Sequence, residues 1–428
     1  MRIRHGLKNN KSSASCQRAR FKFHGASLGL MLVAGLSCFA TCGWTAESGL
    51  SEKSIAVGAG MPLEGDHKQA GLALKKGIEA ALVNQTVRGL RIDYVAVNDF
   101  YDPTKTLDAV TQLLQKGVFL VVGHYGTPTL KAVLPILAEN KVPVLAPFTG
   151  AALTGPGEVL NLRASYSDEV DEVVDAALAA AVKPTEICAY VQNDAYGMSG
   201  VKGLREALAK RPETQKTLAT LDQILALTGD NPARDGIGPV GVYQRSTTNA
   251  RNGYESLKKW EAASGDHCRL VITTGAYNAI SAFIAYARYK NEPWIFSTVS
   301  FGSGAPLLAA LKEKGITHKV IATEIVPPLN SQLASVTEAR KALGTDLNTI
   351  SLEGYLDGKL LLAILQAADG LLTRENFLKA ARRQVYDIGG FKVDFTTDNQ
   401  GSDYVALTTL RDGQFVATTS QELAALFK

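Results

Sequence analysis

Two short turns contain the residues best suited to hold a ligand. Each turn follows an apolar run, FLVV or VPVLAP, whose lack of alternation is typical of parallel strands covered on both faces. Ligands of open parallel sheets bind beyond the carboxyl ends of the strands. Hydroxyls and free amides there, above a helix N-terminus, suit an anion. The candidate binding residues are Tyr125, Gly126, Thr127, Phe148, Thr149 and Gly150.

The segment between the turns predicts a helix. Its apolar residues fall on one helical stripe and are Leu130, Val133, Leu134 and Leu137. Thr127 is the expected N-cap, and Pro128 suits the first helical position. Pro135 is expected to kink this helix. The whole stretch therefore predicts a strand, a turn, a helix and a second strand.

The rest of the chain repeats this alternation of strands and helices. SIAVGAG and RIDYVAVND predict strands around a helix over residues 70–81, and EICAYVQNDAYG starts a second series. HCRLVITTGAYNAISAFIAYARYKNEPWIFSTVS has the same order of elements as the first candidate stretch. This recurrence predicts an α/β fold with two similar, Rossmann-like lobes. Residues 210–254 are expected to hold a variable strand and loops.

The helix that should follow Asn161 begins with several acids. Ser165 or Ser167 can cap it, and its first turns carry Asp168, Glu169, Asp171 and Glu172. These carboxylates are expected to complement the helix dipole rather than take part in catalysis.

Composition and charge exclude some classes of function. The 428 residues carry a formal charge of +4, but seven Lys and Arg residues precede the first acid, Glu47, so the remainder carries 4 − 7 = −3. Such a chain has no basic footprint for nucleic acid. Gly58, Gly60 and Gly65 do not match the GxGxxG spacing of a dinucleotide site, and we expect no cofactor or metal.

The first 46 residues are typical of a secretory signal. A basic stretch precedes ASLGLMLVAGLSCFA, an apolar run too short for a comfortable membrane span. Cleavage is expected after Ala40 or Ala46, which predicts a periplasmic protein. Lipid attachment at Cys38 or Cys42 is a less favoured alternative, because neither has leucine three residues before it. An uncleaved anchor is the other alternative.

Two cysteines remain after the leader, Cys188 and Cys268. Export would permit a disulfide between them. Both lie in or beside apolar runs that should form neighbouring strands, so we favour two buried free thiols over a pair.

The order of several motifs resembles the type 1 periplasmic binding protein family, in particular its leucine/isoleucine/valine-binding branch of ABC-transporter receptors. The motifs are MPLEG, NDFYDP, GHYGTPT, PFTGA, NLRASYSDE and QNDAYG. The resemblance implies a two-lobed clamp with three crossovers near residues 161–164, 323–327 and 391–394. It places lobe one at residues 47–163 and 326–393, and lobe two at residues 164–325 and 394–428.

The resemblance also implies roles for individual residues. Thr127 and Thr149, with Gly150, would hold a ligand carboxylate. Tyr196 and Tyr277 would close over the ligand from lobe two. The side-chain pocket would be shaped by Tyr125, Phe148 and Tyr166. For the tyrosines the alternative is packing at the edge of the core, and for the threonines it is helix capping.

One departure from the family bears on the ligand. Amino-acid receptors commonly place a carboxylate after the fourth strand of lobe two to meet the ligand ammonium, and FSTVSFGS has none. Glu64 or Asp194 is the available substitute. Because a buried ammonium without a partner is costly, a carboxylate, an amide or an aromatic compound fits as well as a branched amino acid.

These features predict a receptor that is not an enzyme. It would close around a small solute by hinge motion and present it to the membrane permease and ATPase subunits of an ABC importer. The chain has no GxSxG, HExxH or P-loop motif, and His124 is expected to be a packed histidine. A ligand sensor of the same fold and an exported α/β enzyme are the alternatives.

The leader gives a direct prediction. If it is a secretory signal, the native protein starts between Thr41 and Glu47, because the basic and apolar segments are removed on export. Intact-mass measurement of the native protein tests this. A cytoplasmic protein that retains Met1 would contradict it.

Overall fold

The structure is a computed structural model that describes residues 47–211, 214–229 and 231–428. The predicted leader and its cleavage sites lie outside these residues. None of the described helices is long and apolar enough to cross a membrane.

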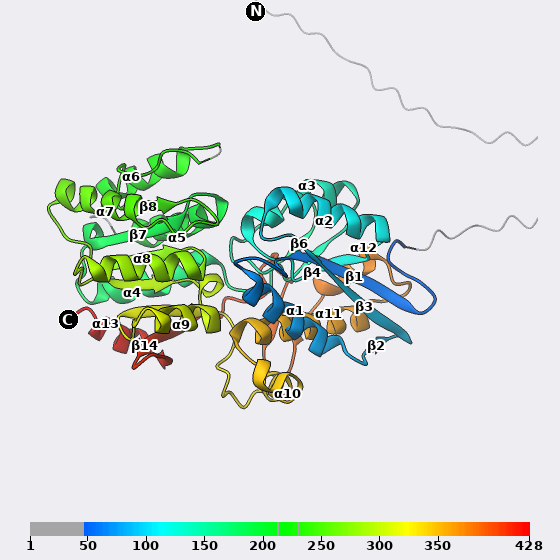
Figure 1. Ribbon diagram of the computed structural model, residues 1–428. Helices are drawn as coiled ribbons and strands as arrows, with labels where there is room; N and C mark the ends of the chain where they lie inside the picture. The colour runs from blue at the N-terminus through cyan, green and yellow to red at the C-terminus, as the bar shows by residue number, and fades with distance from the viewer. Residues whose placement is uncertain (1–46, 212–213, 230) are drawn as a thin grey trace, which may run out of the picture. The chain divides into compact units, whose positions relative to one another are not determined.

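The first domain is built on a six-stranded sheet in the order β2-β3-β1-β4-β5-β6 (Figure 1). All neighbours are parallel except β2 and β3. The strands are β1 Ser54–Met61, β2 Thr86–Val87, β3 Leu90–Asn98, β4 Leu120–Val122, β5 Val144–Leu145 and β6 Val159–Leu160. Its helices are α1 Lys68–Leu82, α2 Pro103–Lys116, α3 Thr127–Glu139, α10 Ala334–Leu343, α11 Thr349–Ala367 and α12 Arg374–Ala381.

Helices α1 and α11 pack backbone against backbone because glycine occupies both sides of the contact. A Cβ atom on Gly77 would lie 2.1 Å from the carbonyl oxygen of Ser351. One on Gly354 would lie 2.3 Å from the carbonyl oxygen of Leu74. Any side chain at these two positions would therefore separate the helices that lie over the first sheet.

The second domain is built on a seven-stranded sheet in the order β15-β14-β11-β10-β9-β7-β8. Its strands are β7 Ile187–Gln192, β8 Val240–Tyr243, β9 Leu270–Thr274, β10 Ile295–Thr298, β11 Val320–Glu324, β14 Ala406–Arg411 and β15 Gln414–Thr418. Strands β14 and β15 are antiparallel additions to five parallel strands. Its helices are α4 Tyr166–Ala179, α5 Ala195–Ala209, α6 Gln215–Ala226, α7 Arg251–Ser264, α8 Tyr277–Tyr289, α9 Gly304–Glu313 and α13 Ser420–Ala425.

The predicted α/β class with two parallel sheets is confirmed, and some local predictions are wrong. Helix α3 begins at Thr127 itself, because Gly126, with φ +96°, occupies the N-cap position. Residues 210–254 contain α6 in addition to a strand and loops. Residues 392–394 form β13, which pairs with β12 at Val385–Asp387 in a separate two-stranded sheet.

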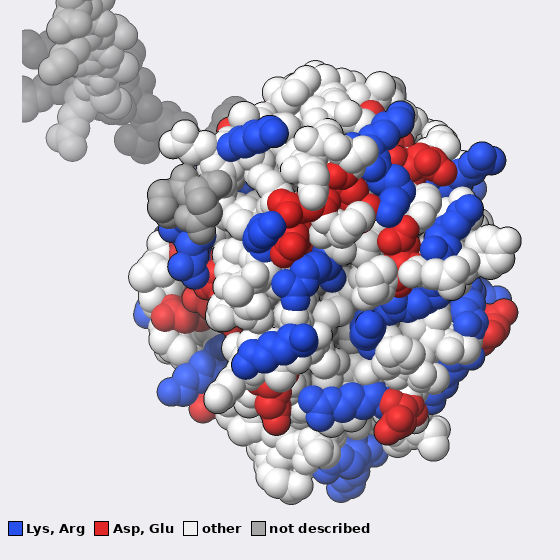
Figure 2. Space-filling model, turned by 90° about the vertical axis from the view of Figure 1, so that its left-hand side faces the viewer, with Lys and Arg blue, Asp and Glu red and all other residues white. Residues whose placement is uncertain are grey.

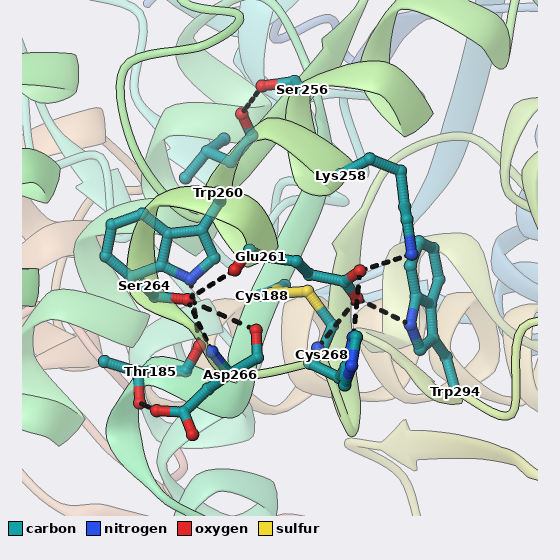
Figure 3. Close-up of a disulfide and its surroundings, with 12 residues drawn as sticks. Thr185, Cys188, Ser256, Lys258, Trp260, Glu261, Ser264, Asp266, Cys268 and Trp294 are labelled. Carbon is teal, nitrogen blue, oxygen red and sulfur yellow. Dashed lines mark hydrogen bonds and ion pairs between the residues drawn. A yellow bond between two sulfur atoms is a disulfide. The ribbon is translucent and has the colours of Figure 1, made fainter.

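The expectation of two free thiols is also wrong, because Cys188 and Cys268 form a disulfide (Figure 3). Strands β7 and β9 are parallel neighbours with Ile187 opposite Leu270. This register brings the two cysteines to a Cα separation of 5.8 Å, within the range that a disulfide spans. Sequence patterns show that both residues lie near strands, but they do not show the register between the strands.

Glu261 fixes the loop that carries Cys268. Its Oε1 atom accepts a hydrogen bond from the backbone N–H of Cys268 at 2.9 Å and from the Trp294 indole at 3.3 Å. Its other oxygen pairs with Lys258 (Figure 3). The carboxylate is buried but fully partnered, which is the condition for a buried charge to be tolerated.

A second group of buried charges lies where the chain passes between the sheets. The Arg163 guanidinium, in the segment between β6 and α4, makes two hydrogen bonds to Glu353 of α11, at 2.9 and 2.6 Å. Glu169 of α4 accepts hydrogen bonds from the N–H and the hydroxyl of Ser300, and from Thr323 of β11. Glu169, one of the acids expected to complement the helix dipole, is fully buried and joins three elements.

Glu324, at the end of β11, is the third carboxylate of this group. Ser303 donates a hydrogen bond to it at 3.0 Å. Burial raises the pKa of Glu324 to about 8, and the neighbouring Glu169 carboxylate adds to this shift, although the Ser303 hydroxyl opposes it. The native protein therefore keeps a proton on Glu324 at pH values where the unfolded chain has lost it.

The disulfide gives a testable prediction. Replacing both cysteines (Cys188→Ala with Cys268→Ala) should lower the free energy of unfolding by roughly 2–4 kcal/mol, because the bond closes a long loop in the unfolded chain. Urea unfolding of both proteins measures the difference. Wild type in excess reductant should match the variant. Two titratable thiols in unreduced, denatured mature protein would contradict the prediction.

Glu324 predicts a pH-dependent stability. The native pKa of Glu324 lies above the ordinary value of 4.5. The protonated carboxyl therefore makes its full contribution to the free energy of unfolding below pH 4.5, and this contribution is lost as the pH rises toward 8. Glu324→Gln should therefore stabilise the protein more at pH 8.5 than at pH 5. The expected difference is roughly 1–3 kcal/mol, because a tenfold change in proton affinity corresponds to about 1.4 kcal/mol. Urea unfolding at both pH values measures this.

A matched control for that experiment is Glu338→Gln, since Glu338 is exposed on α10. Its effect should stay within about 0.5 kcal/mol at both pH values. An equal effect of Glu324→Gln at pH 5 and pH 8.5 would show that the buried carboxyl does not titrate in this range.

Candidate ligand-binding site

The two candidate turns lie side by side at the carboxyl ends of β4 and β5. The N–H of Phe148 donates to the His124 carbonyl at 2.8 Å, and the N–H of Gly126 donates to the Phe148 carbonyl at 3.1 Å. These bonds extend the pairing of the two strands into the turns. As a result, the hydroxyl oxygens of Thr127 and Thr149 are 2.6 Å apart, and both side chains are buried.

The two hydroxyls leave a proton available for a ligand. The Thr149 hydroxyl oxygen accepts from the N–H of Ala151 at 3.2 Å. If Thr127 donates to Thr149, the Thr149 proton is free, and the reverse assignment frees the Thr127 proton. Thr127 is also the first residue of α3, where backbone N–H groups have no intrahelical acceptor. The group therefore offers donors and the positive end of a helix dipole to an anion.

Tyr166 adds a third hydroxyl beside this pair. The Ser165 side chain caps α4 by accepting from the N–H of Asp168, which fixes Tyr166 as the first helical residue. Its N–H donates to the Gly150 carbonyl at 2.7 Å, and its ring packs on Gly150. Among the described residues the buried Tyr166 hydroxyl has no hydrogen-bond partner. Burial raises its pKa to about 12, so it remains a neutral donor.

Aromatic rings from both domains surround this corner. Tyr125 stacks on Phe148 with ring centroids 5.1 Å apart. Phe301, in the 3₁₀ helix Ser300–Gly302 after β10, lies 5.0 Å from Tyr125, 5.4 Å from Phe148 and 4.7 Å from Tyr196. Sequence reasoning did not select Phe301. Its position after the fourth parallel strand of the second domain was the available signal.

Tyr196 and Tyr277, the two predicted residues of the second domain, make different contacts. The hydroxyl of Tyr196 donates to the Gly275 carbonyl at 3.2 Å within its own domain, and its ring lies 5.3 Å from that of Tyr166. The hydroxyl of Tyr277 donates to the Asp66 carbonyl at 2.6 Å, which joins the second domain to the loop before α1. Tyr277 therefore contacts the first domain directly.

The other residues considered from sequence are placed as follows. Glu64 is exposed, whereas the Asp194 carboxylate caps α5 by accepting from the N–H of Tyr196 and also accepts a hydrogen bond from the Gln192 side-chain amide at 2.8 Å.

His124 is buried, and its Nδ1 accepts a hydrogen bond from the N–H of Gly60 at 3.3 Å, as expected of a packed histidine. Burial lowers the pKa of His124 to about 3. No group of three potential metal ligands occurs in the described part of the chain.

Two adjoining cavities open beside these residues. One, of about 290 Å³, is lined by Gly150 and Tyr166, and the other, of about 570 Å³, by Thr127 and Lys131. Both are closed on one side by the first turns of α5, and they share Ala151 and Ser199. Of the candidate residues, Thr127, Gly150 and Tyr166 therefore line space beside α5.

Comparisons with known proteins agree with this architecture. Residues 54–212 match the family model described as "Periplasmic binding protein". The Leu/Ile/Val-binding protein homolog 2 of Brucella abortus (strain 2308) is 32% identical over 112 residues, which are 25% of this chain and 30% of that protein. The aligned part of this chain thus spans less than a third of the length of that relative.

Solved structures cover much more of the chain. A possible leucine/isoleucine/valine-binding protein from Rhodopirellula baltica SH 1 is 28% identical with a TM-score of 0.73, covering 87% of this chain and 98% of that one. A branched-chain amino acid ABC transporter protein from Thermus thermophilus with bound valine is 16% identical with a TM-score of 0.67, covering 88% and 99%. The second likeness shows the fold alone.

Residues 54–212 thus resemble the periplasmic binding protein family, and the two parallel-sheet domains have the type 1 periplasmic binding protein fold of solved structures that include a possible leucine/isoleucine/valine-binding protein.

Proposed function

We propose that this chain is the exported solute-binding receptor of an ABC importer. It binds a small amino-acid-like, carboxylate or amide ligand between its two domains and delivers it, without chemical change, to membrane permease and ATPase subunits. The main support is the group formed by Thr127, Thr149 and Tyr166: three buried hydroxyls from the start of α3, the turn after β5 and the start of α4. The relatives that match are themselves binding proteins.

Closure of the two domains is supported by the contacts between them. Tyr277 bonds to the Asp66 carbonyl, and Gln192 of β7 donates to the Tyr101 hydroxyl at 3.3 Å. The remaining contacts include the rings around Phe301. A boundary made of a few hydrogen bonds and apolar faces can open at the crossovers, so a ligand that contacts both sides favours the closed state.

Surface charge is compatible with a small-molecule receptor. On the face drawn in Figure 2, Lys and Arg side chains are interspersed with Asp and Glu over the visible surface. Charged side chains of the second domain also form pairs, as in Arg205 with Asp222 and Lys210 with Asp171. Interspersed charge of this kind is not the concentrated basic surface that nucleic-acid binding uses.

The anion-binding role of the hydroxyls is testable. A thermal-shift screen of carboxylates and amides first selects the acid that binds best. Thr127→Ala and Thr149→Ala should each weaken binding of that acid by about tenfold or more, because a hydrogen bond to a charged group contributes roughly 1.5–3 kcal/mol. Binding of its uncharged amide should change much less. Calorimetry on both compounds measures this.

Thr127→Ser and Thr149→Ser are the matched controls, because they keep the hydroxyl and should bind the acid nearly as well as wild type. Unchanged affinity of the alanine variants, together with lower stability in urea, would show that these threonines only support the helix terminus.

A further inference from the structure

We propose that protonation of His67 opens the boundary between the two domains, because the closed arrangement can hold this side chain only as a neutral imidazole. The inference goes beyond the proposed function. It concerns a conformational equilibrium of the chain itself and can be tested without a ligand. For a receptor that closes on its solute, it means that acid weakens binding.

His67 is buried in a loop that is otherwise exposed. It is 3% exposed and occupies the N-cap position of α1, where its side chain makes no capping hydrogen bond. Among the described residues, neither of its ring nitrogens has a hydrogen-bond partner. The residues on either side of it are exposed: Glu64, Gly65, Asp66 and Lys68.

Groups from both domains cover this ring. Tyr101, in the turn before α2, lies edge-to-face with it at a centroid distance of 4.7 Å. From the second domain, the Tyr277 ring lies 6.3 Å away, and the Tyr277 hydroxyl donates to the Asp66 carbonyl at 2.6 Å. Arg245, in the loop after β8, is near enough to disfavour a positive charge on His67. Opening would therefore withdraw Tyr277 and Arg245 from His67 and admit water to the ring.

An imidazolium would be strongly unfavourable in this position. It carries a full charge and two N–H donors, and neither nitrogen has an acceptor here. A charged group without partners or water is costly to bury. Burial lowers the pKa of His67 to about 4; the Asp66 carboxylate opposes this shift, and Arg245 adds to it. The open domains can therefore keep a proton that the closed domains release.

Other titratable groups lie at the same boundary. Asp194, in the turn before α5, pairs with Arg245 at 3.9 Å, and burial raises the pKa of Asp194. Asp99 accepts from the N–H of Tyr101 at 2.9 Å, and burial raises the pKa of Asp99 to about 7. The two tyrosines beside the ring stay neutral, because burial raises the pKa of both. The experiment must therefore separate His67 from the two aspartates.

Linkage gives the size and direction of the effect. With a pKa of 6.5 for His67 in the open state and about 4 in the closed state, the ratio of open to closed protein rises about tenfold from pH 7.5 to pH 5.5. The rise begins as the pH falls below 6.5, because only the open state binds the proton there. By the same linkage, any change that opens the domains must raise the pKa of His67.

Histidine NMR of the mature protein tests this reciprocity. Four histidines follow residue 46, and the signal of His67 is the one lost in His67→Phe. Tyr277→Ala, which removes a contact across the boundary, should raise the pKa of His67 toward 6.5. Tyr289→Ala is the matched control, because Tyr289 lies on the same helix and is 79% exposed. The pKa of His124, which is buried within the first domain, should stay unchanged in all of these proteins.

Spin labels on the two domains measure opening directly. Glu139→Cys on α3 and Glu255→Cys on α7 place the labels at exposed positions, and the disulfide keeps the native cysteines unreactive. The ratio of the longer to the shorter label distance should rise about tenfold from pH 7.5 to pH 5.5. In His67→Phe, which keeps a ring but cannot take a proton, the ratio should be the same at both pH values. This variant retains Asp99 and Asp194, so it separates their titration from that of His67.

Three results would overturn the inference. The first is an equal pH response in His67→Phe, or in His67→Gln if the phenylalanine variant does not fold. The second is a pKa of His67 that Tyr277→Ala leaves unchanged. The third is a label distance in wild type that does not change with pH; if His67 takes up its proton at that constant distance, the rings of Tyr101 and Tyr277 hold the imidazolium. Each of these results would leave the proposed receptor function standing.

Discussion

The buried ion pair between Arg163 and Glu353 is the interaction on which the geometry around the site depends. Both groups are removed from water, so neither is stable there without the other, and the loss of one partner of such a pair typically costs about 3–5 kcal/mol. Arg163 lies in the first crossover and Glu353 in α11, so the pair fixes the crossover to the first domain. It also places the guanidinium 4.4 Å from the centroid of the Phe148 ring, and Nη1 of Arg163 donates a hydrogen bond to the Ser300 hydroxyl at 3.3 Å.

The donors of the site follow from sheet geometry. Parallel neighbours end at the same edge, so two turns that are more than twenty residues apart in sequence bring Thr127 and Thr149 into hydrogen-bonding distance. Tyr166 joins them because the chain leaves the first sheet after β6 and starts α4 directly above Gly150. The three hydroxyls therefore come from three separate segments, each fixed by a strand end or a helix cap.

The boundary between the domains has a different character. It is mainly aromatic, with Phe301 of the second domain packed on rings of the first, and few hydrogen bonds cross it. Aromatic faces bury much apolar area without requiring partners of fixed direction, so they can separate and return. Under the proposed function, the polar network around Arg163 would preserve the site while the aromatic faces separate on opening.

The sequence alone determined the class of fold, the order of most elements and the two turns that carry the candidate residues. It did so because apolar runs, helical stripes and turn residues are local patterns that follow directly from backbone geometry. Helix α6 was missed within residues 210–254 because glycine, proline and threonine around it weaken the helical pattern.

Only the tertiary structure decided which distant residues meet. The disulfide between Cys188 and Cys268 depends on the register of β7 against β9, and the burial of Glu169 depends on the approach of β11 and the segment around Ser300. The residue type of Phe301 gives no signal by itself, since a single phenylalanine after a strand is ordinary in any sequence, and only its position after the fourth parallel strand of the second domain could have drawn attention to it. Its packing against Tyr125 and Phe148 comes from rings of the other domain, and such contacts are a property of the folded chain and not of any one stretch.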